Sequence, residues 1–198
     1  MTRLLTIAAL AIATTSLSVP AFAADTAWKV DPSHSSSEFA IKHFALSNVK
    51  GSFPVKSGAI ALADGKDIPT SVDAVLDASG VNTSEANRDK DLRSANWFDT
   101  DKYPTVTFKS TKISVTDPGK FTIVGDLTLH GVTKPVTLEA HFEGRGQGGR
   151  GEKRVAYSAI TSIHRKDFAL IDSRTNALGA LVVGDDAAIS ISIEAISQ

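Results

Sequence analysis

The sequence contains no cysteine. This absence excludes a disulfide framework, a thiolate metal site, a cysteine nucleophile and lipidation at a cysteine. The folded protein must therefore be stabilised by burial of its side chains, without covalent cross-links.

The sequence also lacks a second long hydrophobic run after its first residues. The apolar run over residues 4–13 follows Arg3 and precedes Ala21-Phe22-Ala23, which has the A-x-A form of a cleavage signal. The run is shorter than the roughly 20 apolar residues that a transmembrane helix needs. This pattern predicts a cleaved secretory signal peptide over residues 1–23, a periplasmic location and no membrane span.

The remaining segment, residues 24–198, has little net charge. Without Arg3 it holds 20 basic and 22 acidic residues, a net charge of −2, which argues against a nucleic-acid partner. Removing 23 of the 198 residues leaves 175, which fits one domain with a sizeable core or a cavity.

Apolar residues alternate with polar ones along most of this segment, which indicates half-buried β-strands. About eight or nine stretches have strand-like patterns: residues 28–30, 38–43, 59–62, 72–76, 105–110, 121–129, 136–142, 154–163 and 187–196. Short turns between them favour antiparallel neighbours, because parallel neighbours need long crossovers. The sequence predicts an all-β fold, an eight-stranded antiparallel β-barrel, whose closure removes exposed edges. A β-sandwich stays open as the alternative.

One connection, about residues 82–103, is long enough to contain a helix. Asn82 is the expected N-cap, with Glu85 as the acidic half of a capping box. The stretch NRDKDLRSANWFD, residues 87–99, has six charged residues among its thirteen. Leu92 is the only large apolar residue between positions 86 and 95, so this helix must lie over the sheet or its opening.

Several motifs resemble those of the YceI-like family, lipocalin-like periplasmic proteins also described as polyisoprenoid-binding. They are WKVDPSHS (28–35), FAIKH (39–43), VKGSF (49–53), the stretch 87–99 followed by KYPTVTF (102–108), and GDLTLHGVTKPVTL (125–138), which is the most specific. The resemblance implies an extended, lipocalin-like eight-stranded barrel with an apolar internal pocket for a long-chain amphiphile.

The sequence departs from the family pattern in three respects. Asp91 stands where the family often has histidine, and Ala169 stands where glycine is usual. Ser37 and Ala187 occupy positions where larger apolar residues are expected. The smaller side chains either widen the pocket or are compensated by repacking.

The inward faces of the predicted strands supply candidates for a lipid tunnel. They are Phe39, Ile41, Phe108, Phe121, Leu129, Phe142, Tyr157 and Ile189. Such residues more often fill a barrel core than line a cavity, and the family resemblance favours the tunnel for the set as a whole.

A second group of candidates forms the predicted mouth, where a polar head group would bind. It comprises His43, Arg88, Asp89, Arg93, Trp97 and Phe98. Charged donors above an apolar wall suit a hydroxyl, quinone or phosphate group. The alternatives are a solvated charged helix and, for His43, a hydrogen-bonded interior histidine.

The sequence gives little support for catalysis or a metal. The histidines lack metal-ligand spacing, and there is no G-x-S-x-G motif. We therefore predict a carrier of an isoprenoid or quinone-like lipid, with no enzymatic activity and no cofactor, that partners a membrane cytochrome, a lipid-handling protein or a second copy of itself. The rivals are a lipid-modifying enzyme that uses His43 or His34 with Asp31 or Asp89, and a structural envelope protein with a filled core.

Overall fold

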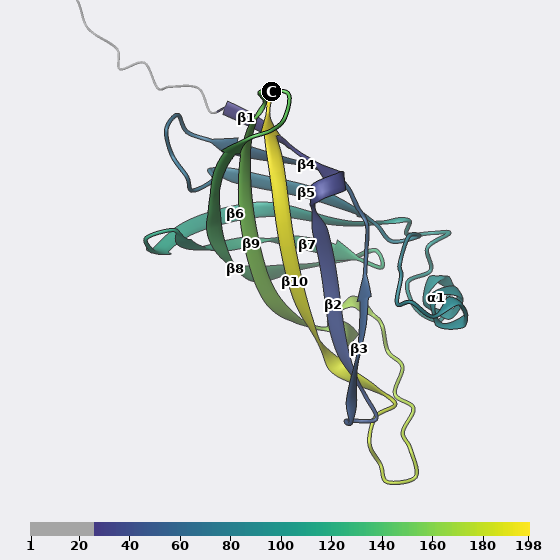
Figure 1. Ribbon diagram of the computed structural model, residues 1–198. Helices are drawn as coiled ribbons and strands as arrows, with labels where there is room; N and C mark the ends of the chain where they lie inside the picture. The colour runs from purple at the N-terminus through teal and green to yellow at the C-terminus, as the bar shows by residue number, and fades with distance from the viewer. Residues whose placement is uncertain (1–25) are drawn as a thin grey trace, which may run out of the picture.

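The computed structural model describes residues 26–198 (Figure 1), so the predicted signal peptide, residues 1–23, lies outside the described residues. The strands are β1 (Thr26–Val30), β2 (Ser36–His43), β3 (Ser47–Ser52), β4 (Val55–Leu62), β5 (Ser71–Asp77), β6 (Thr105–Asp117), β7 (Lys120–Leu129), β8 (Val132–Gln147), β9 (Lys153–His164) and β10 (Val183–Ser197). The helices are α1 (Ala86–Arg93) and the short 3-10 helices η1 (Pro32–His34) and η2 (Arg165–Phe168).

The strands form one antiparallel sheet that closes on itself. The order is β1-β4-β5-β6-β7-β8-β9-β10-β2-β3, and β1 also pairs with β10. Strands β1 and β2 both run along β10, interrupted by η1, so that together they occupy one position in the barrel. Strands β3 and β4 likewise form one interrupted strand beside them. The result is the predicted eight-stranded antiparallel barrel.

Strand β3 is absent from the sequence prediction. Its residues, SNVKGS, are mostly polar or small, and its side chains are exposed or half-buried. Pairing with β2, from Glu38↔Ser52 to His43↔Ser47, makes the segment a strand despite its weak apolar pattern. Long-range backbone pairing therefore overrides the local signal here.

Buried side chains gather in two clusters along the barrel. The first cluster lies near strand β1, where it pairs with β4 and β10, and it contains Trp28, Phe121 and Tyr157. Closer to α1, the second contains Phe98 and Phe168. Strand alternation places Trp28, Phe121 and Tyr157 on the inner face. Phe98 and Phe168 come from the turn after α1 and from η2.

Helix α1 begins differently from its prediction. Its N-cap is Glu85, whose carboxylate accepts hydrogen bonds from the backbone N–H groups of Asn87 and Arg88. Asn82 is not the cap, because its backbone pairs with Ser52 and its side chain accepts from the Ser84 N–H. The helix has no buried residue and projects beside the barrel (Figure 1).

The connection between η2 and β10 is held by Arg165, whose side chain is only 3% exposed. Its guanidinium donates to the carbonyls of Gly184, Leu170, Asp172 and Val183 and to the Asp185 carboxylate. A buried charge is tolerated because so many acceptors surround it. One side chain thus fixes the start and the end of this long connection.

Ala169 ends η2 in the left-handed region, with a φ of 59° and a ψ of 20°. Its backbone N–H donates to the carbonyls of Arg165 and Lys166. A β-carbon is sterically unfavourable in this conformation, whereas glycine adopts it freely. Glycine, the residue expected here from the family resemblance, would adopt this conformation without strain.

Replacing Ala169 by glycine should raise the free energy of unfolding by about 1 kcal/mol, because it removes this steric cost. Urea denaturation of both proteins measures the difference. Ala180→Gly, at a position of the same connection without a positive φ, should give no gain. Equal effects of the two substitutions would rule out the backbone conformation as the cause.

Candidate ligand-binding cavity

The interior of the barrel is not completely filled. An inner cavity of about 150 Å³ lies between the inward faces of the strands. Its wall is largely aliphatic and aromatic, with Phe121 from β7, Tyr157 from β9 and Ile60 from β4. The Tyr157 hydroxyl is satisfied away from this space, because it donates to the Asp67 carbonyl over 2.8 Å, and burial raises its pKa.

An outer cavity of about 250 Å³ adjoins the inner one towards α1. Side chains that line both cavities are Phe53, Leu129, Ile163 and Ile189. Because these shared side chains form the boundary, the two spaces follow one another along the barrel. The outer cavity differs in having a polar rim, which includes Lys42, His43, Thr83, Arg88, Asp91 and Arg174.

Most of the predicted tunnel residues line one of these cavities. Phe108, Phe121 and Tyr157 line the inner cavity, Phe39 and Ile41 line the outer cavity, and Leu129 and Ile189 line both. Whether these side chains contact a ligand stays a prediction.

Phe142, which is also predicted to line the tunnel, lines neither of the two cavities. Its ring packs against the Tyr157 ring, with centroids 5.7 Å apart, and the Arg145 guanidinium lies 6.0 Å from its centroid. Arg145 also covers the Trp28 ring and donates to Asp67. Phe142 therefore packs under Arg145 beside the first cluster.

Four of the six predicted mouth residues line the outer cavity, and the other two lie outside it. His43, Arg88, Trp97 and Phe98 line the outer cavity. The rings of Trp97 and Phe98 are buried, so the strongly charged stretch ends in an apolar wall. Trp97 is fixed by Asp91, whose carboxylate accepts from its indole N–H over 3.0 Å. This contact gives a role to the aspartate that departs from the family pattern.

Asp89 and Arg93 support the mouth from outside the cavity. The Asp89 carboxylate accepts from the hydroxyl and backbone N–H of Thr83, and the hydroxyl contact holds the pKa of Asp89 below its usual value. Arg93 donates to the Val81 carbonyl over 3.4 Å. Arg88 donates to the Thr83 hydroxyl and carbonyl. Much of the charge on α1 therefore orders the segment before the helix.

Two small residues widen the interior. Ser37 is buried and lines the inner cavity, and Ala187 is buried and lines the outer cavity. These are the positions where larger apolar residues are expected from the family pattern. Neighbouring side chains leave both cavities open rather than closing over them.

Sequence reasoning missed Phe53, which stands at the centre of an aromatic row. Its ring centroid lies 5.6 Å from that of Phe39 and 5.1 Å from that of Phe98. Gly51 makes room for this row, because a β-carbon there would lie 2.4 Å from the Phe39 ring. The motif VKGSF contains both Gly51 and Phe53. A glycine two positions before an aromatic residue is the sequence feature that could have indicated this packing.

Sequence reasoning also missed the part of the wall that comes from the η2–β10 connection. Leu170, Arg174 and Val182 line the outer cavity, although this stretch has no strand or helix pattern. Arg174 is held at the rim by Asp172 over 2.6 Å. Only the tertiary anchoring of the connection brings these residues to the mouth.

The residues named for a lipid-modifying enzyme do not converge in a cavity. His34 bonds Asp31 over 2.8 Å beside η1, and neither residue lines the inner or the outer cavity. His43 lines the outer cavity and its ring stacks near Phe44, with centroids 4.1 Å apart. Within residues 26–198, no hydrogen bond joins His43 to Asp89.

One group of metal-type donors occurs among residues 26–198, formed by Asp31, His34 and Glu194. The guanidinium of Arg154 bridges its two carboxylates. The hydroxyl of Ser33, followed by His34 and Arg154, holds the pKa of Asp31 well below its usual value. These contacts tie η1 to β9 and β10. The three side chains therefore lie together because they join these elements.

Comparisons with known proteins agree with this architecture. The chain matches the YceI-like domain over residues 28–195. A UPF0312 protein of Vibrio parahaemolyticus is 38% identical over 152 residues, which cover 77% of this chain and 80% of the relative. No helix within residues 26–198 is long and apolar enough to cross a membrane.

Two solved structures are similar in fold. The YCEI protein of Campylobacter jejuni has a TM-score of 0.68 at 30% identity, covering 79% of this chain and 90% of that one. A polyisoprenoid binding domain from Saccharophagus degradans has a TM-score of 0.67 at 18% identity, covering 87% and 99%. Fold and cavity thus define a single-chain antiparallel barrel with an apolar interior. This chain belongs to the YceI-like family.

Phe108 tests whether the inner cavity is open in solution. Its half-buried ring lines that cavity, whereas Phe168 is 2% exposed within the second cluster and lines neither cavity. Phe168→Ala should lower the free energy of unfolding by about 3–5 kcal/mol, and Phe108→Ala by about 2 kcal/mol or less, because fewer contacts are lost beside an existing space. Urea denaturation measures both. Equal losses would indicate a filled core.

Proposed function

We propose that this protein binds a long-chain isoprenoid or a related amphiphilic lipid, such as a quinone, and carries or stores it in the periplasm. The observation that carries the proposal is the pair of adjoining apolar cavities inside a closed barrel. Together they fall within the range of roughly 300–1,000 Å³ that small-molecule pockets occupy.

The polarity of the two cavities gives the ligand a direction. The inner cavity suits an apolar tail, because its wall is mainly aliphatic and aromatic. The rim of the outer cavity places Lys42, His43, Arg88 and Arg174 where a polar head group would lie. An amphiphile bound tail first therefore meets complementary chemistry along its length.

A carrier must also release its ligand. Burial of a CH₂ group gains about 0.8 kcal/mol relative to water, but a bilayer offers the tail nearly the same gain. The protein therefore needs only a small preference over the membrane. Small wall residues such as Ser37 and Ala187 leave the interior loosely packed, which suits reversible loading.

The comparisons support this assignment at the level of the family. The similar domain from Saccharophagus degradans is described as polyisoprenoid binding. The predicted signal peptide over residues 1–23 supports a periplasmic location. The bonded pair of His34 and Asp31 lies outside both cavities, which favours binding over catalysis there.

Native mass spectrometry of the exported protein, purified from its own periplasm without detergent, tests the proposal. We expect one stoichiometric long-chain species that organic extraction releases, because an apolar cavity inside a barrel retains its ligand during purification. A protein that is empty, and that takes up neither added prenyl lipids nor quinones, would refute the proposal.

Filling the outer cavity tests where the ligand lies. Ala187→Leu places extra atoms into the cavity from β10 and should reduce the amount or the chain length of bound lipid at least several-fold. Ala188→Leu is the matched control, because Ala188 is the next residue and faces outward. Competition with a fluorescent prenyl lipid measures both. Equal binding by the two variants would contradict this location.

A further inference from the structure

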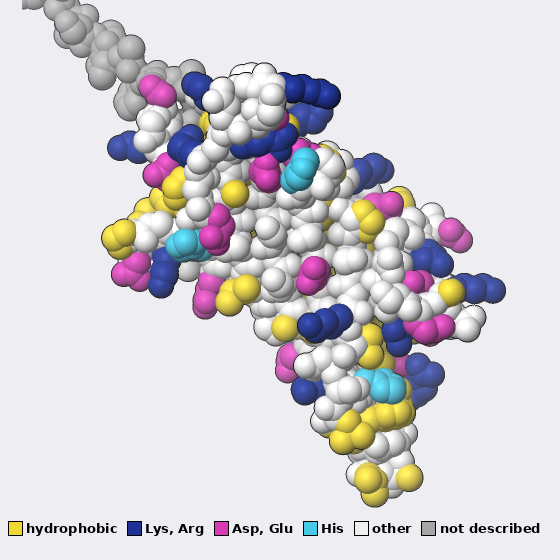
Figure 2. All heavy atoms as spheres, viewed as in Figure 1, with side chains coloured by type: hydrophobic (Ala, Val, Ile, Leu, Met, Phe, Trp, Pro, Cys, Tyr) yellow, Lys and Arg dark blue, Asp and Glu magenta, His cyan; other side chains and the backbone are white. Residues whose placement is uncertain are grey.

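Large apolar side chains are exposed together at the end of the molecule that carries the outer cavity. Leu46, in the β2–β3 turn, is 82% exposed. Ile171 and Leu178, in the η2–β10 connection, are 71% and 92% exposed. Figure 2 shows apolar side chains on this protruding end, and we call these three residues the apolar tip.

The two loops of the apolar tip adjoin and are held in place. The Phe44 N–H donates to the Val182 carbonyl over 3.1 Å, and His43 pairs with Val183 where β2 meets β10. The connection itself is folded back by pairing of Thr175 with Leu181. The apolar side chains therefore project from an ordered support at the lower end of Figure 1.

The same loops line the outer cavity. His43 and Val49 flank the turn that carries Leu46, and Leu170 and Arg174 lie close in sequence to Ile171 and Leu178. Any surface that covers the apolar tip would thus lie beside the cavity rim. The apolar tip is continuous with the proposed route of the ligand.

The size of the apolar tip decides against a second protein chain as its occupant. A stable protein interface buries about 800 Å² on each partner. Three side chains on two narrow loops supply only a small part of such an area. A bilayer adapts to any shape, and a few apolar side chains can anchor a protein at its surface.

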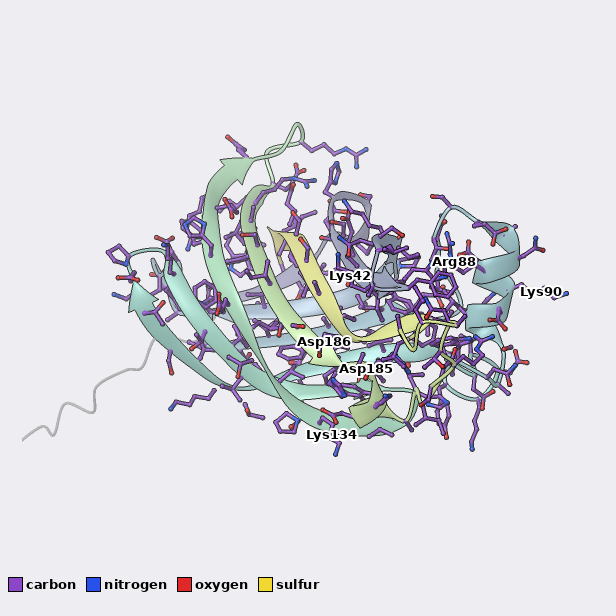
Figure 3. All side chains as sticks on the ribbon, turned by 90° about the horizontal axis from the view of Figure 1, so that it is seen from below. Lys42, Arg88, Lys90, Lys134, Asp185 and Asp186 are labelled. Atoms are coloured by element: carbon purple, nitrogen blue, oxygen red, sulfur yellow. The ribbon has the colours of Figure 1, made fainter. Side chains whose placement is uncertain are left out.

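The charges near the apolar tip are balanced. Lys166 pairs with Asp185 over 2.9 Å, and His164 lies 3.0 Å from Asp186. Figure 3 views this end from below and labels Lys42, Asp185 and Asp186, cationic and anionic side chains of the same region. A balanced surface predicts attachment through apolar insertion rather than through attraction to anionic lipid.

We propose that the apolar tip inserts into the surface of a lipid bilayer and holds the outer cavity against it. An amphiphile then passes between the membrane and the barrel without crossing water. This inference rests on the proposed function, since it assigns the source and destination of the ligand.

Flotation with lipid vesicles tests the docking directly. Residues 24–198, which contain the whole described barrel, are mixed with vesicles of pure phosphatidylcholine or of phosphatidylcholine with phosphatidylglycerol. We expect similar binding to both and little effect of salt. Leu46→Asp with Leu178→Asp should weaken binding about ten-fold or more, because two inserted apolar side chains become charged.

The matched control is Val115→Asp with Ile160→Asp. These residues are 65% and 56% exposed on β6 and β9, outside the two loops of the apolar tip. Their replacement should leave vesicle binding unchanged. Equal loss in both double variants, or unchanged binding of the variant at the apolar tip, would overturn the proposal.

A tryptophan probe reports insertion itself. Leu178→Trp should shift its fluorescence to shorter wavelength with vesicles and be quenched by brominated lipid, whereas Val115→Trp should show neither change. A wild-type protein that ignores vesicles but forms a dimer, which Leu46→Asp with Leu178→Asp separates, would overturn membrane docking in favour of self-association.

Ligand uptake from a water-soluble cyclodextrin complex separates docking from binding. The double variant of the apolar tip should load prenyl lipid normally from this complex and about ten-fold more slowly from vesicles. If the wild-type protein floats with vesicles but takes up prenyl lipid from neither source, the proposed function is refuted and the docking to the membrane stands. Equal loading from vesicles by wild type and variant would refute the role of the apolar tip in transfer.

Discussion

Strand β1 pairs with β4 on one edge and with the end of β10 on the other, and this pairing closes the sheet. Closure of eight strands creates an interior that side chains just fill, or that holds one small ligand when some are small. Here Ser37 and Ala187 face that interior, and two cavities remain. The apolar interior depends on this geometry, because an open sheet would expose the same apolar faces to water.

The barrel was predictable because its signals are local. Alternation assigned Phe121, Tyr157 and Ile189 to the inner face, and short turns fixed the antiparallel order. Strand β3 and the lining by Leu170 and Arg174 were not predictable, because neither segment has a periodic pattern. Strand pairing places the first, and the buried Arg165 places the second. Such contacts between distant residues leave no trace in a single sequence.

The charged stretch from Arg88 to Asp99 shows the limit of reading function from residue type. Its charges suggested recognition of a head group, yet Asp89 is committed to Thr83, and Arg88 also bonds Thr83. Asp91 likewise fixes Trp97. Much of this charge therefore orders the segment around the outer cavity. In the proposed carrier, selectivity for a head group would fall on Arg88 together with the rim donors from β2 and from the η2–β10 connection.

The two ends of the barrel differ in chemistry, and the difference gives the molecule a direction. At one end the Arg145 guanidinium lies over the Trp28 ring and donates to the Asp67 carboxylate. The Asp67 carbonyl accepts a hydrogen bond from the Tyr157 hydroxyl. At the other end the cavity wall continues into loops with exposed leucines. The polar contacts at the first end leave the outer cavity as the side from which a tail would enter the proposed carrier. Contact with a membrane would therefore be useful at the end that carries the outer cavity.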